Sequence, residues 1–252
     1  MSRFRRIALA TLFAAPLCLG LGACGKGNET TSGVPKGEPI AAIQAPAGKA
    51  WADTVTVTPE GGYLMGNPNA PLKLLEYASL TCPHCADFSE DAAEKLRDKN
   101  GARGVVSYEL RNQIHDGLDL TMAMLTRCGA PESFHALSEQ VWLNLPQIVQ
   151  TAQGNQAAMA AAMQSEDQSK RYKAIADAAG LTDFFAARGI SSDQSATCLA
   201  DAAKAEQIVQ NSQKQSEELQ VEGTPTFFLN GHKLDVRSWK DLEPILQDAG
   251  AR

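Results

Sequence analysis

Two cysteines in the first half of the chain carry its most specific chemical signal. Cys82, Pro83, His84 and Cys85 form a C-x-x-C tetrapeptide. Two thiols at this spacing can close into one disulfide and reopen, so the motif favours thiol redox chemistry. The same spacing also occurs in zinc sites, and the tetrapeptide by itself leaves redox and metal chemistry both open.

The residues around the tetrapeptide predict the elements that must position it. Residues 72–77 form an apolar run behind turn-forming residues and predict a strand that leads into the motif. Apolar residues then recur every fourth position between 83 and 99, which predicts a helix, and 105–110 alternates as a further strand. A dithiol at the start of a helix between two strands is the context in which C-x-x-C indicates redox chemistry.

The rest of the chain predicts a fold that is interrupted and then resumed. A strand is predicted at 54–58, ahead of the motif, and another at 226–229, followed by a final helix at 238–248. The region between is rich in Ala, Gln, Leu and Glu and predicts an all-helical insertion, with Trp142 in its core. Its predicted helices cover 118–127, 132–143, 157–163, 171–178 and 193–219.

The predicted position of the tetrapeptide gives its two sulfurs different roles. Cys82 would lie at the first helical turn, where free backbone N–H groups and the positive end of the helix dipole favour a thiolate. Pro83 suits the first helical position, where no N–H is needed. His84 is expected to add a donor or a positive charge beside the Cys82 sulfur. Cys82 is therefore predicted to be the nucleophile and Cys85 the more buried partner that resolves the mixed disulfide.

Two segments on either side of the predicted insertion carry a family resemblance. Residues 76–85 and residues 221–231 (VEGTPTFFLNG) resemble the DsbA-like branch of the thioredoxin superfamily. The resemblance implies an α/β thioredoxin fold with an inserted all-helical subdomain, and a thiol-disulfide oxidoreductase that donates a disulfide to exported proteins. The predicted units are a signal peptide at 1–23, a flexible linker at 24–52, the first part of the thioredoxin fold at 53–115, the helical insertion at 116–206 and the second part at 207–252.

The same resemblance assigns three further residues and the partners. Glu76 matches a buried acid that could relay a proton to or from Cys85. Thr224 and Pro225 match the cis-proline loop that lies against the active-site disulfide and pairs with substrate. The implied partners are reduced exported proteins and a membrane quinone-linked thiol oxidase that reoxidises the protein. The chain is expected to act as a monomer without a cofactor.

Other functions of the dithiol stay open. Within the same fold a disulfide isomerase or reductase is the nearest alternative, and a Cu(I)-binding metallochaperone also fits a surface dithiol. A structural zinc site would need two more ligands, and His115, His135 and His232 are scattered and form no second pair. No metal is therefore predicted.

Cys128 and Cys198 both fall in the predicted insertion. In an oxidising compartment they are expected to form a structural disulfide, which closes a loop of roughly 70 residues and contributes about 2–4 kcal/mol. The alternative is two buried free thiols, because spacing says nothing about their proximity.

The amino terminus has the features of an export signal. Three arginines precede an apolar stretch at 7–21, which contains Cys18 and is too short for a comfortable membrane span. Residues 21–24 read Leu-Gly-Ala-Cys and resemble a bacterial lipobox, which predicts lipidation of Cys24 and a location in the periplasm on a bacterial membrane. Plain secretion and an uncleaved anchor are the alternatives.

Composition sets the remaining bounds. The chain has 252 residues, 44% of them hydrophobic, and a formal net charge of −6. One core with an inserted subdomain fits this length, and the acidic surface argues against a nucleic-acid binder. Residues 25–49 have almost no large apolar side chains, so this segment is predicted to be a flexible tether.

Overall fold

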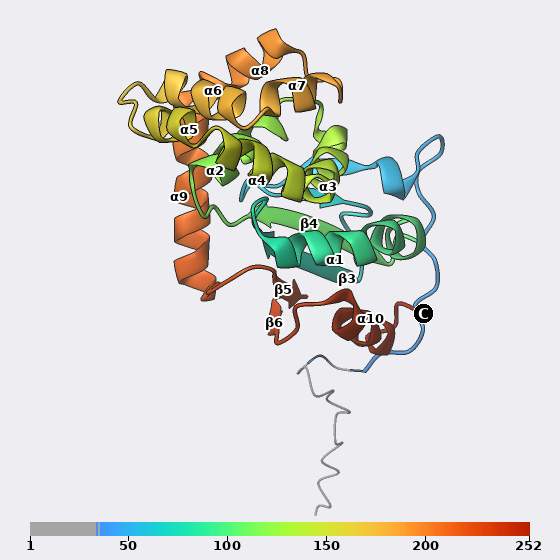
Figure 1. Cartoon of the computed structure of the whole chain (residues 1–252). Coiled ribbons are helices and arrows are strands. Elements are labelled where there is room, and N and C mark those ends of the chain that lie inside the picture. The colour runs from blue at the N-terminus through green and yellow to red at the C-terminus, as the bar shows by residue number, and fades with distance from the viewer. Residues whose placement is uncertain (1–33, 35) are drawn as a thin grey trace, which may run out of the picture.

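A six-stranded mixed sheet forms the centre of the protein in a computed structural model that describes residue 34 and residues 36–252 (Figure 1). The spatial order of the strands is β1-β2-β4-β3-β5-β6, with β3 and β4 parallel and every other neighbouring pair antiparallel. The strands are β1 Val55–Val57, β2 Tyr63–Met65, β3 Leu72–Ala78, β4 Val106–Asn112, β5 Thr226–Leu229 and β6 His232–Leu234.

The central strand β3 carries the chain to the tetrapeptide. Its register places Glu76 between Leu110 of β4 and Phe227 of β5. Neighbours on both sides make β3 an interior strand, which agrees with its largely buried, apolar sequence. The parallel pairing of Ala78 with Asn112 brings the carboxyl ends of β3 and β4 to one edge of the sheet, and Cys82 follows that edge.

Helices cover the sheet and form a separate layer above it. The helix after the tetrapeptide, α1, packs against α3 and α10. The helices between β4 and β5 form the upper part of the molecule in Figure 1, and α9 descends along the side of the sheet. The helices are α1 Pro83–Glu94, α2 Gly117–Leu125, α3 Phe134–Leu143, α4 Leu145–Gly154, α5 Gln156–Met163, α6 Gln168–Ala178, α7 Leu181–Ala186, α8 Ser192–Leu199, α9 Ala202–Leu219 and α10 Trp239–Asp248, with short 3-10 helices at Trp51–Asp53 and Pro131–Ser133 and a π-helix at Lys95–Gly101.

The predicted fold class is confirmed, and the differences from prediction are local. The long helical run predicted at 193–219 is divided into α8 and α9, because the Asp201 side chain accepts the Lys204 N–H and begins a new helix. The helix predicted to reach residue 99 becomes a π-helix at Lys95. The short elements β2, β6, α4 and α7 were not predicted. The helix α9 also crosses the predicted boundary between residues 206 and 207.

The segment predicted to be a flexible tether lies against the body where it is described. Gly37 N–H donates to the Asp248 carbonyl at 2.8 Å, and Ile43 N–H donates to the Arg103 carbonyl at 2.9 Å. These are backbone hydrogen bonds, which need no large apolar side chain, and composition therefore gave no sign of them.

The features predicted for the amino terminus lie outside the described residues. They are the signal at 1–23, Cys18 and Cys24. Within the described part of the chain, no helix has the length and apolar character needed to cross a membrane.

The helical layer holds a disulfide between Cys128 and Cys198, whose Cα atoms are 5.9 Å apart. Cys128 follows α2, and Cys198 lies near the end of α8. The bond joins two helices of the insertion, and both cysteines are half-buried.

Candidate active site

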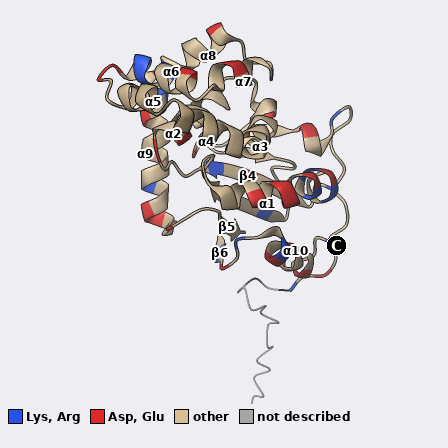
Figure 2. Ribbon diagram, in the orientation of Figure 1, with Lys and Arg blue, Asp and Glu red and all other residues tan. Residues whose placement is uncertain are grey.

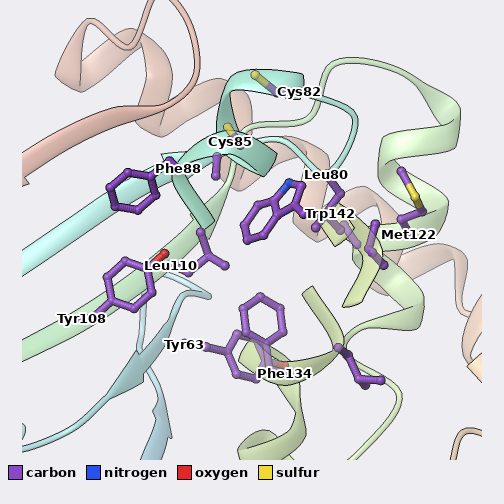
Figure 3. Close-up of a cluster of buried hydrophobic side chains, with 14 of the residues drawn as sticks. Tyr63, Leu80, Cys82, Cys85, Phe88, Tyr108, Leu110, Met122, Phe134 and Trp142 are labelled. Atoms are coloured by element: carbon purple, nitrogen blue, oxygen red, sulfur yellow. The ribbon is translucent and has the colours of Figure 1, made fainter. Parts of the chain in front are cut away.

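The tetrapeptide opens α1. Cys82 is the residue that caps the helix, in an extended conformation, and Pro83 occupies the first helical turn. Figure 3 shows both sulfurs at this turn, with Cys85 lying between Cys82 and the side chains of Phe88, Leu110 and Trp142, which belong to the same buried cluster. Both cysteines are free thiols. Cys82 keeps 8% of its surface exposed, and Cys85 is fully buried.

The environment of Cys82 stabilises its thiolate. The pKa of Cys82 is lowered from the ordinary 9.0 to about 5, chiefly because the Cys85 thiol donates a hydrogen bond to its sulfur. Burial acts in the opposite direction, and Thr224 and the backbone N–H groups of Cys85 and His84 lower the pKa further. These N–H groups are the free donors of the first helical turn.

The pKa of Cys85 is shifted in the opposite direction from that of Cys82. Burial raises the pKa of the Cys85 thiol far above its ordinary value, and the neighbouring Cys82 and Glu76 raise it further. At neutral pH the reduced pair is therefore one thiolate, at Cys82, and one thiol, at Cys85. A thiolate near the surface and a proton-bearing thiol beneath it fit the predicted nucleophile and resolving cysteine.

Glu76 lies buried beneath the pair on β3. Burial raises its pKa from 4.5 to about 8, although the Tyr108 hydroxyl donates a hydrogen bond to its Oε2. The Oε1 atom is buried without a hydrogen-bond partner among the described residues. The Glu76 carboxyl group keeps its proton near neutral pH and interacts electrostatically with Cys85. It can therefore exchange that proton with the Cys85 sulfur. The buried-acid position expected from the resemblance is thus occupied by a buried acid.

Tyr108 was not predicted as a site residue. It lies on β4, is buried, and its own pKa is raised well above 10.0 by burial and by Glu76. It therefore stays a hydrogen-bond donor. The sequence offered only a weak signal, because a Tyr in an alternating strand is most often core.

The loop before β5 completes the site. The Thr224–Pro225 peptide bond is cis. The Cys82 Sγ lies 3.3 Å from the Thr224 carbonyl oxygen, to which the protonated thiol can donate a hydrogen bond. The structure therefore brings the two predicted motifs together, although 142 positions separate Cys82 from Thr224.

His84 contributes to the thiolate through its main chain. Its side chain is 72% exposed, and Nδ1 lies 3.8 Å from an Asp87 carboxylate oxygen. Its backbone N–H is among the groups that lower the Cys82 pKa. The expected donor at this position is thus supplied by the peptide group.

Two residues of the helical insertion fix the loop that leads into Cys82. Asp119 accepts hydrogen bonds from the Ser79 hydroxyl at 2.7 Å and from the Leu80 N–H at 2.9 Å. The Trp142 indole N–H donates to the Ser79 carbonyl at 3.0 Å. Burial raises the pKa of Asp119 to about 6. Asp119 was missed by prediction, although a single acid inside an apolar helix is a detectable signal.

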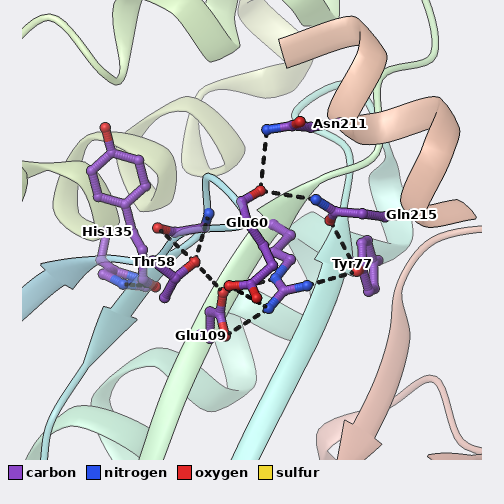
Figure 4. A network of polar contacts seen from close by, with 10 residues as sticks. Thr58, Glu60, Tyr77, Glu109, His135, Asn211 and Gln215 are labelled. Atoms are coloured by element: carbon purple, nitrogen blue, oxygen red, sulfur yellow. Dashed lines mark hydrogen bonds and ion pairs between the residues drawn. The ribbon is translucent and has the colours of Figure 1, made fainter. Parts of the chain in front are cut away.

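A polar network outside the thiol site connects the sheet to α9 (Figure 4). Arg111 donates to the Glu109 carboxylate at 2.7 Å and to the Tyr77 hydroxyl at 3.1 Å. The Tyr77 hydroxyl donates in turn to Gln215 of α9 at 3.0 Å. His135, also drawn there, binds the Tyr63 carbonyl through Nε2 at 3.0 Å, and burial lowers its pKa to about 4. A neutral, buried His135 has a structural role.

Metal binding is the alternative chemistry of the dithiol. Over the described ranges, no group of three or more His, Cys, Asp or Glu side chains could hold a metal ion. A Cu(I) ion bound by the dithiol would require both sulfurs as thiolates. The raised pKa of Cys85 means that Cu(I) would have to displace its proton, so copper binding should weaken as the pH falls.

Comparisons with known proteins point to the same family. Residues 58–248 match the family model described as Thioredoxin. Relatives named as protein-disulfide oxidoreductases include one from Rickettsia bellii, 26% identical over 194 residues, and one from Rickettsia conorii, 29% identical over 187 residues. These alignments cover 75% and 74% of this chain but only 65% and 59% of the relatives, so the chain spans less than two thirds of their length.

Solved structures show the same architecture. The protein-disulfide isomerase from Novosphingobium aromaticivorans is 30% identical, with a TM-score of 0.70 over 74% of this chain and 96% of that one. The alpha-DsbA1 protein of Wolbachia pipientis is 22% identical, with a TM-score of 0.59 over 74% of this chain and 89% of that one. The predicted membership of the thioredoxin family is therefore confirmed, and the likeness to a DsbA protein is confirmed at the level of the fold.

Proposed function

Because the chain belongs to the thioredoxin family, we propose that it is a thiol-disulfide oxidoreductase that donates its Cys82–Cys85 disulfide to exported proteins. The observation that carries this proposal is that the pKa of Cys82 is lowered while the pKa of Cys85 is raised. Each pKa unit by which the Cys82 thiolate is stabilised corresponds to about 1.4 kcal/mol. Stabilising the thiolate stabilises the reduced protein, which makes the disulfide form an oxidant.

The proposed reaction is two successive disulfide exchanges. A substrate thiolate attacks Sγ of Cys82 in the disulfide form, a mixed disulfide forms, and Cys85 leaves and takes up a proton, which Glu76 can supply. A second substrate thiolate then attacks the substrate sulfur of the mixed disulfide and releases Cys82 as a thiolate. Two electrons pass from the substrate thiols to the protein, and the substrate gains one disulfide.

The Thr224–Pro225 segment has a positional role in this proposal. Its carbonyl already lies within hydrogen-bond distance of the Cys82 sulfur. Backbone at this position can pair with an extended substrate segment while the substrate sulfur approaches Cys82.

The direct test is the equilibrium reduction potential of the Cys82 and Cys85 pair, combined with oxidation of a reduced two-cysteine peptide. An oxidising potential, well above that of a structural disulfide, and stoichiometric peptide oxidation are expected. A strongly reducing potential would assign the protein to the reductases instead.

Disulfide isomerisation is the second candidate function, since the Novosphingobium aromaticivorans neighbour is named as an isomerase. An isomerase must act in its reduced form, with Cys82 as the attacking thiolate. Refolding of a scrambled multi-disulfide protein separates the two functions. An oxidase in its reduced form should leave scrambled pairings largely unchanged, whereas an isomerase should restore activity to them.

The location and reoxidation of the protein complete the proposal. The predicted signal at 1–23 and the lipobox at 21–24 support export and a lipid anchor at Cys24, which would place the site in the periplasm. A membrane quinone-linked thiol oxidase is the proposed reoxidant. Palmitate labelling of the protein and of Cys24→Ala tests the anchor, and equal labelling of the two would remove it from the proposal.

A further inference from the structure

A large groove opens beside the tetrapeptide, on the side of α1 that faces the helical insertion. Its volume is about 680 Å³, and it begins at Thr81 and Pro83, the two neighbours of Cys82. One wall is α1, and the other consists of α3 and α4. Grooves of this size hold several side chains of an extended segment. The cis-proline loop does not line it, so it is separate from the backbone-pairing position proposed above.

The wall formed by α3 and α4 carries an apolar strip among polar residues, which are Glu139, Gln140, Gln150 and Gln153. Trp142, Leu145, Pro146 and Val149 line it, and Leu143 at the end of α3 keeps 69% of its surface exposed. A leucine that exposed is one of the few large apolar side chains on the described surface. It offers a contact for an apolar side chain of a partner.

The wall formed by α1 is acidic (Figure 2). Asp87, Glu90 and Glu94 line the groove at spacings of three and four residues, which places them on one face of the helix. Like charges four residues apart destabilise a helix, and among the described residues neither Glu90 nor Glu94 forms an ion pair. Arg97, the one Lys or Arg among the residues that line the groove, is bound to Glu139 at 3.5 Å and to Asp98 at 3.1 Å, and it also interacts electrostatically with Glu94.

From this charge pattern we infer that the groove binds substrate segments in which an apolar residue and a Lys or Arg lie beside the reacting cysteine. The inference rests on the proposed function and names its substrate class. The apolar side chain would contact Leu143 and the surface around Trp142, and the cation would lie between Glu90 and Glu94. Since the groove begins next to Cys82, a segment bound there extends directly away from the sulfur.

Binding can be measured without any redox step. Three peptides share the same flanking sequence and contain Ser-Leu-Lys, Ser-Leu-Gln or Ser-Leu-Glu. In each peptide, serine replaces the reacting cysteine. Fluorescence anisotropy measures their affinities for the protein. The Lys peptide is expected to bind roughly 10-fold more tightly than the Glu peptide at low salt, and the ratio should fall at high salt. In Glu90→Gln/Glu94→Gln the ratio should fall to about twofold or less.

Matched controls use exposed residues of α9, which does not line this groove. Glu206→Gln/Glu217→Gln removes the same number of charges elsewhere and should keep the 10-fold ratio. Leu143→Gln should weaken binding of all three peptides, whereas Leu219→Gln should not.

The corresponding cysteine peptides, with a second cysteine in the shared flanking sequence to complete the disulfide and a small-molecule disulfide as terminal oxidant, then test turnover. Oxidation of all three, with kcat/KM in the order Lys, Gln, Glu, is expected. Charge-independent binding, or a ratio unchanged in Glu90→Gln/Glu94→Gln, would overturn the groove assignment while oxidation still supported the proposed function. Charge-selective binding without any oxidation would instead overturn the proposed function. If the groove substitutions abolish self-association of the protein in sedimentation and leave peptide affinity unchanged, a second copy of the chain is the occupant and the inference is wrong.

Discussion

The two cysteine pairs of this protein differ in nearly every physical respect. Cys82 and Cys85 are free thiols, buried at the first turn of a helix beside an ionisable acid, whereas Cys128 and Cys198 are bonded and half-buried between two helices of the insertion. The pair expected to react is thus the less exposed one. What distinguishes it is the set of donors aimed at one sulfur, which divides the pair into a thiolate and a thiol.

The comparison is tested most strongly by removing one sulfur from each pair. Cys82→Ala is expected to reduce peptide oxidation to the uncatalysed rate, because no other described sulfur has a lowered pKa. Cys128→Ala/Cys198→Ala should oxidise the same peptide at close to the normal rate at 25 °C. Stopped-flow kinetics with a reduced fluorogenic peptide measures both. An active Cys82→Ala protein would refute the assigned nucleophile.

The second prediction concerns the titration of Cys82. In the reduced protein, alkylation by iodoacetamide should rise with pH around a midpoint near 5, because only the thiolate reacts. In Cys85→Ala the midpoint should rise toward the ordinary 9.0, since the Cys85 hydrogen bond is the largest of the lowering effects. Mass mapping identifies the alkylated residue, and native Cys128 and Cys198 should stay unlabelled.

The lowered pKa of Cys82 also determines how the unfolding free energy of the reduced protein changes with pH. The folded pKa of Cys82 is lower than the unfolded one, so the thiolate stabilises the reduced protein fully above pH 9 and progressively less as the pH falls toward 5. The oxidised protein lacks this contribution. The unfolding free energy of the reduced protein minus that of the oxidised protein should therefore fall between pH 9 and pH 5. A difference that stayed constant over this range would contradict the assignment.

The third prediction isolates Glu76. Its folded pKa is raised from 4.5 to about 8, so between these values the unfolded chain loses a proton that the folded protein keeps. Unfolding free energy should therefore fall as pH rises through this window, by an amount on the order of 4 kcal/mol at 1.4 kcal/mol per pKa unit. Glu76→Gln should lack this decrease, because its amide does not titrate.

Urea unfolding of the oxidised protein between pH 4.5 and 8.5 measures this difference without titration of Cys82. Asp119, whose pKa is about 6, titrates in the same window in both proteins and cancels in the comparison. Glu217→Gln, at an exposed position, should follow the unsubstituted protein. Parallel profiles for Glu76→Gln and the unsubstituted protein would show that Glu76 is ionised in the fold.

The sequence predicts the reactive pair better than its supporting contacts. Cys82, Pro83 and the helix start are local features, and the period of apolar residues and the preceding strand define them. Thr224 and Pro225 were found only through a family resemblance, since nothing in local physics links positions so far apart. Asp119 and Trp142 support the loop before Cys82 from a separate layer, and such contacts depend on how the insertion docks on the sheet.

The predicted boundaries of elements were wrong where one residue or a few main-chain contacts outweigh the sequence pattern. The division of α8 from α9 depends on one capping aspartate, Asp201, within a run of good helix formers. The attachment of residues around Gly37 to the end of α10 depends on main-chain hydrogen bonds, which every sequence could make. Composition therefore predicts loose chain there, and only the three-dimensional structure shows the docking.

The last prediction concerns the bonded pair and has the smallest expected effect. Its bond closes a loop of 70 residues, so removing it increases the entropy of the unfolded chain. Cys128→Ala/Cys198→Ala should lose about 2–4 kcal/mol of unfolding free energy, measured in urea with the active-site pair oxidised. The slope of unfolding against urea should rise slightly, because the unfolded chain without the cross-link exposes more surface. A loss of stability confined to the double alanine protein, with the Cys82 titration unchanged, would show that one pair acts on the fold and the other on substrate. A shifted Cys82 midpoint would show instead that the insertion transmits strain to the redox site through the loop that Asp119 holds.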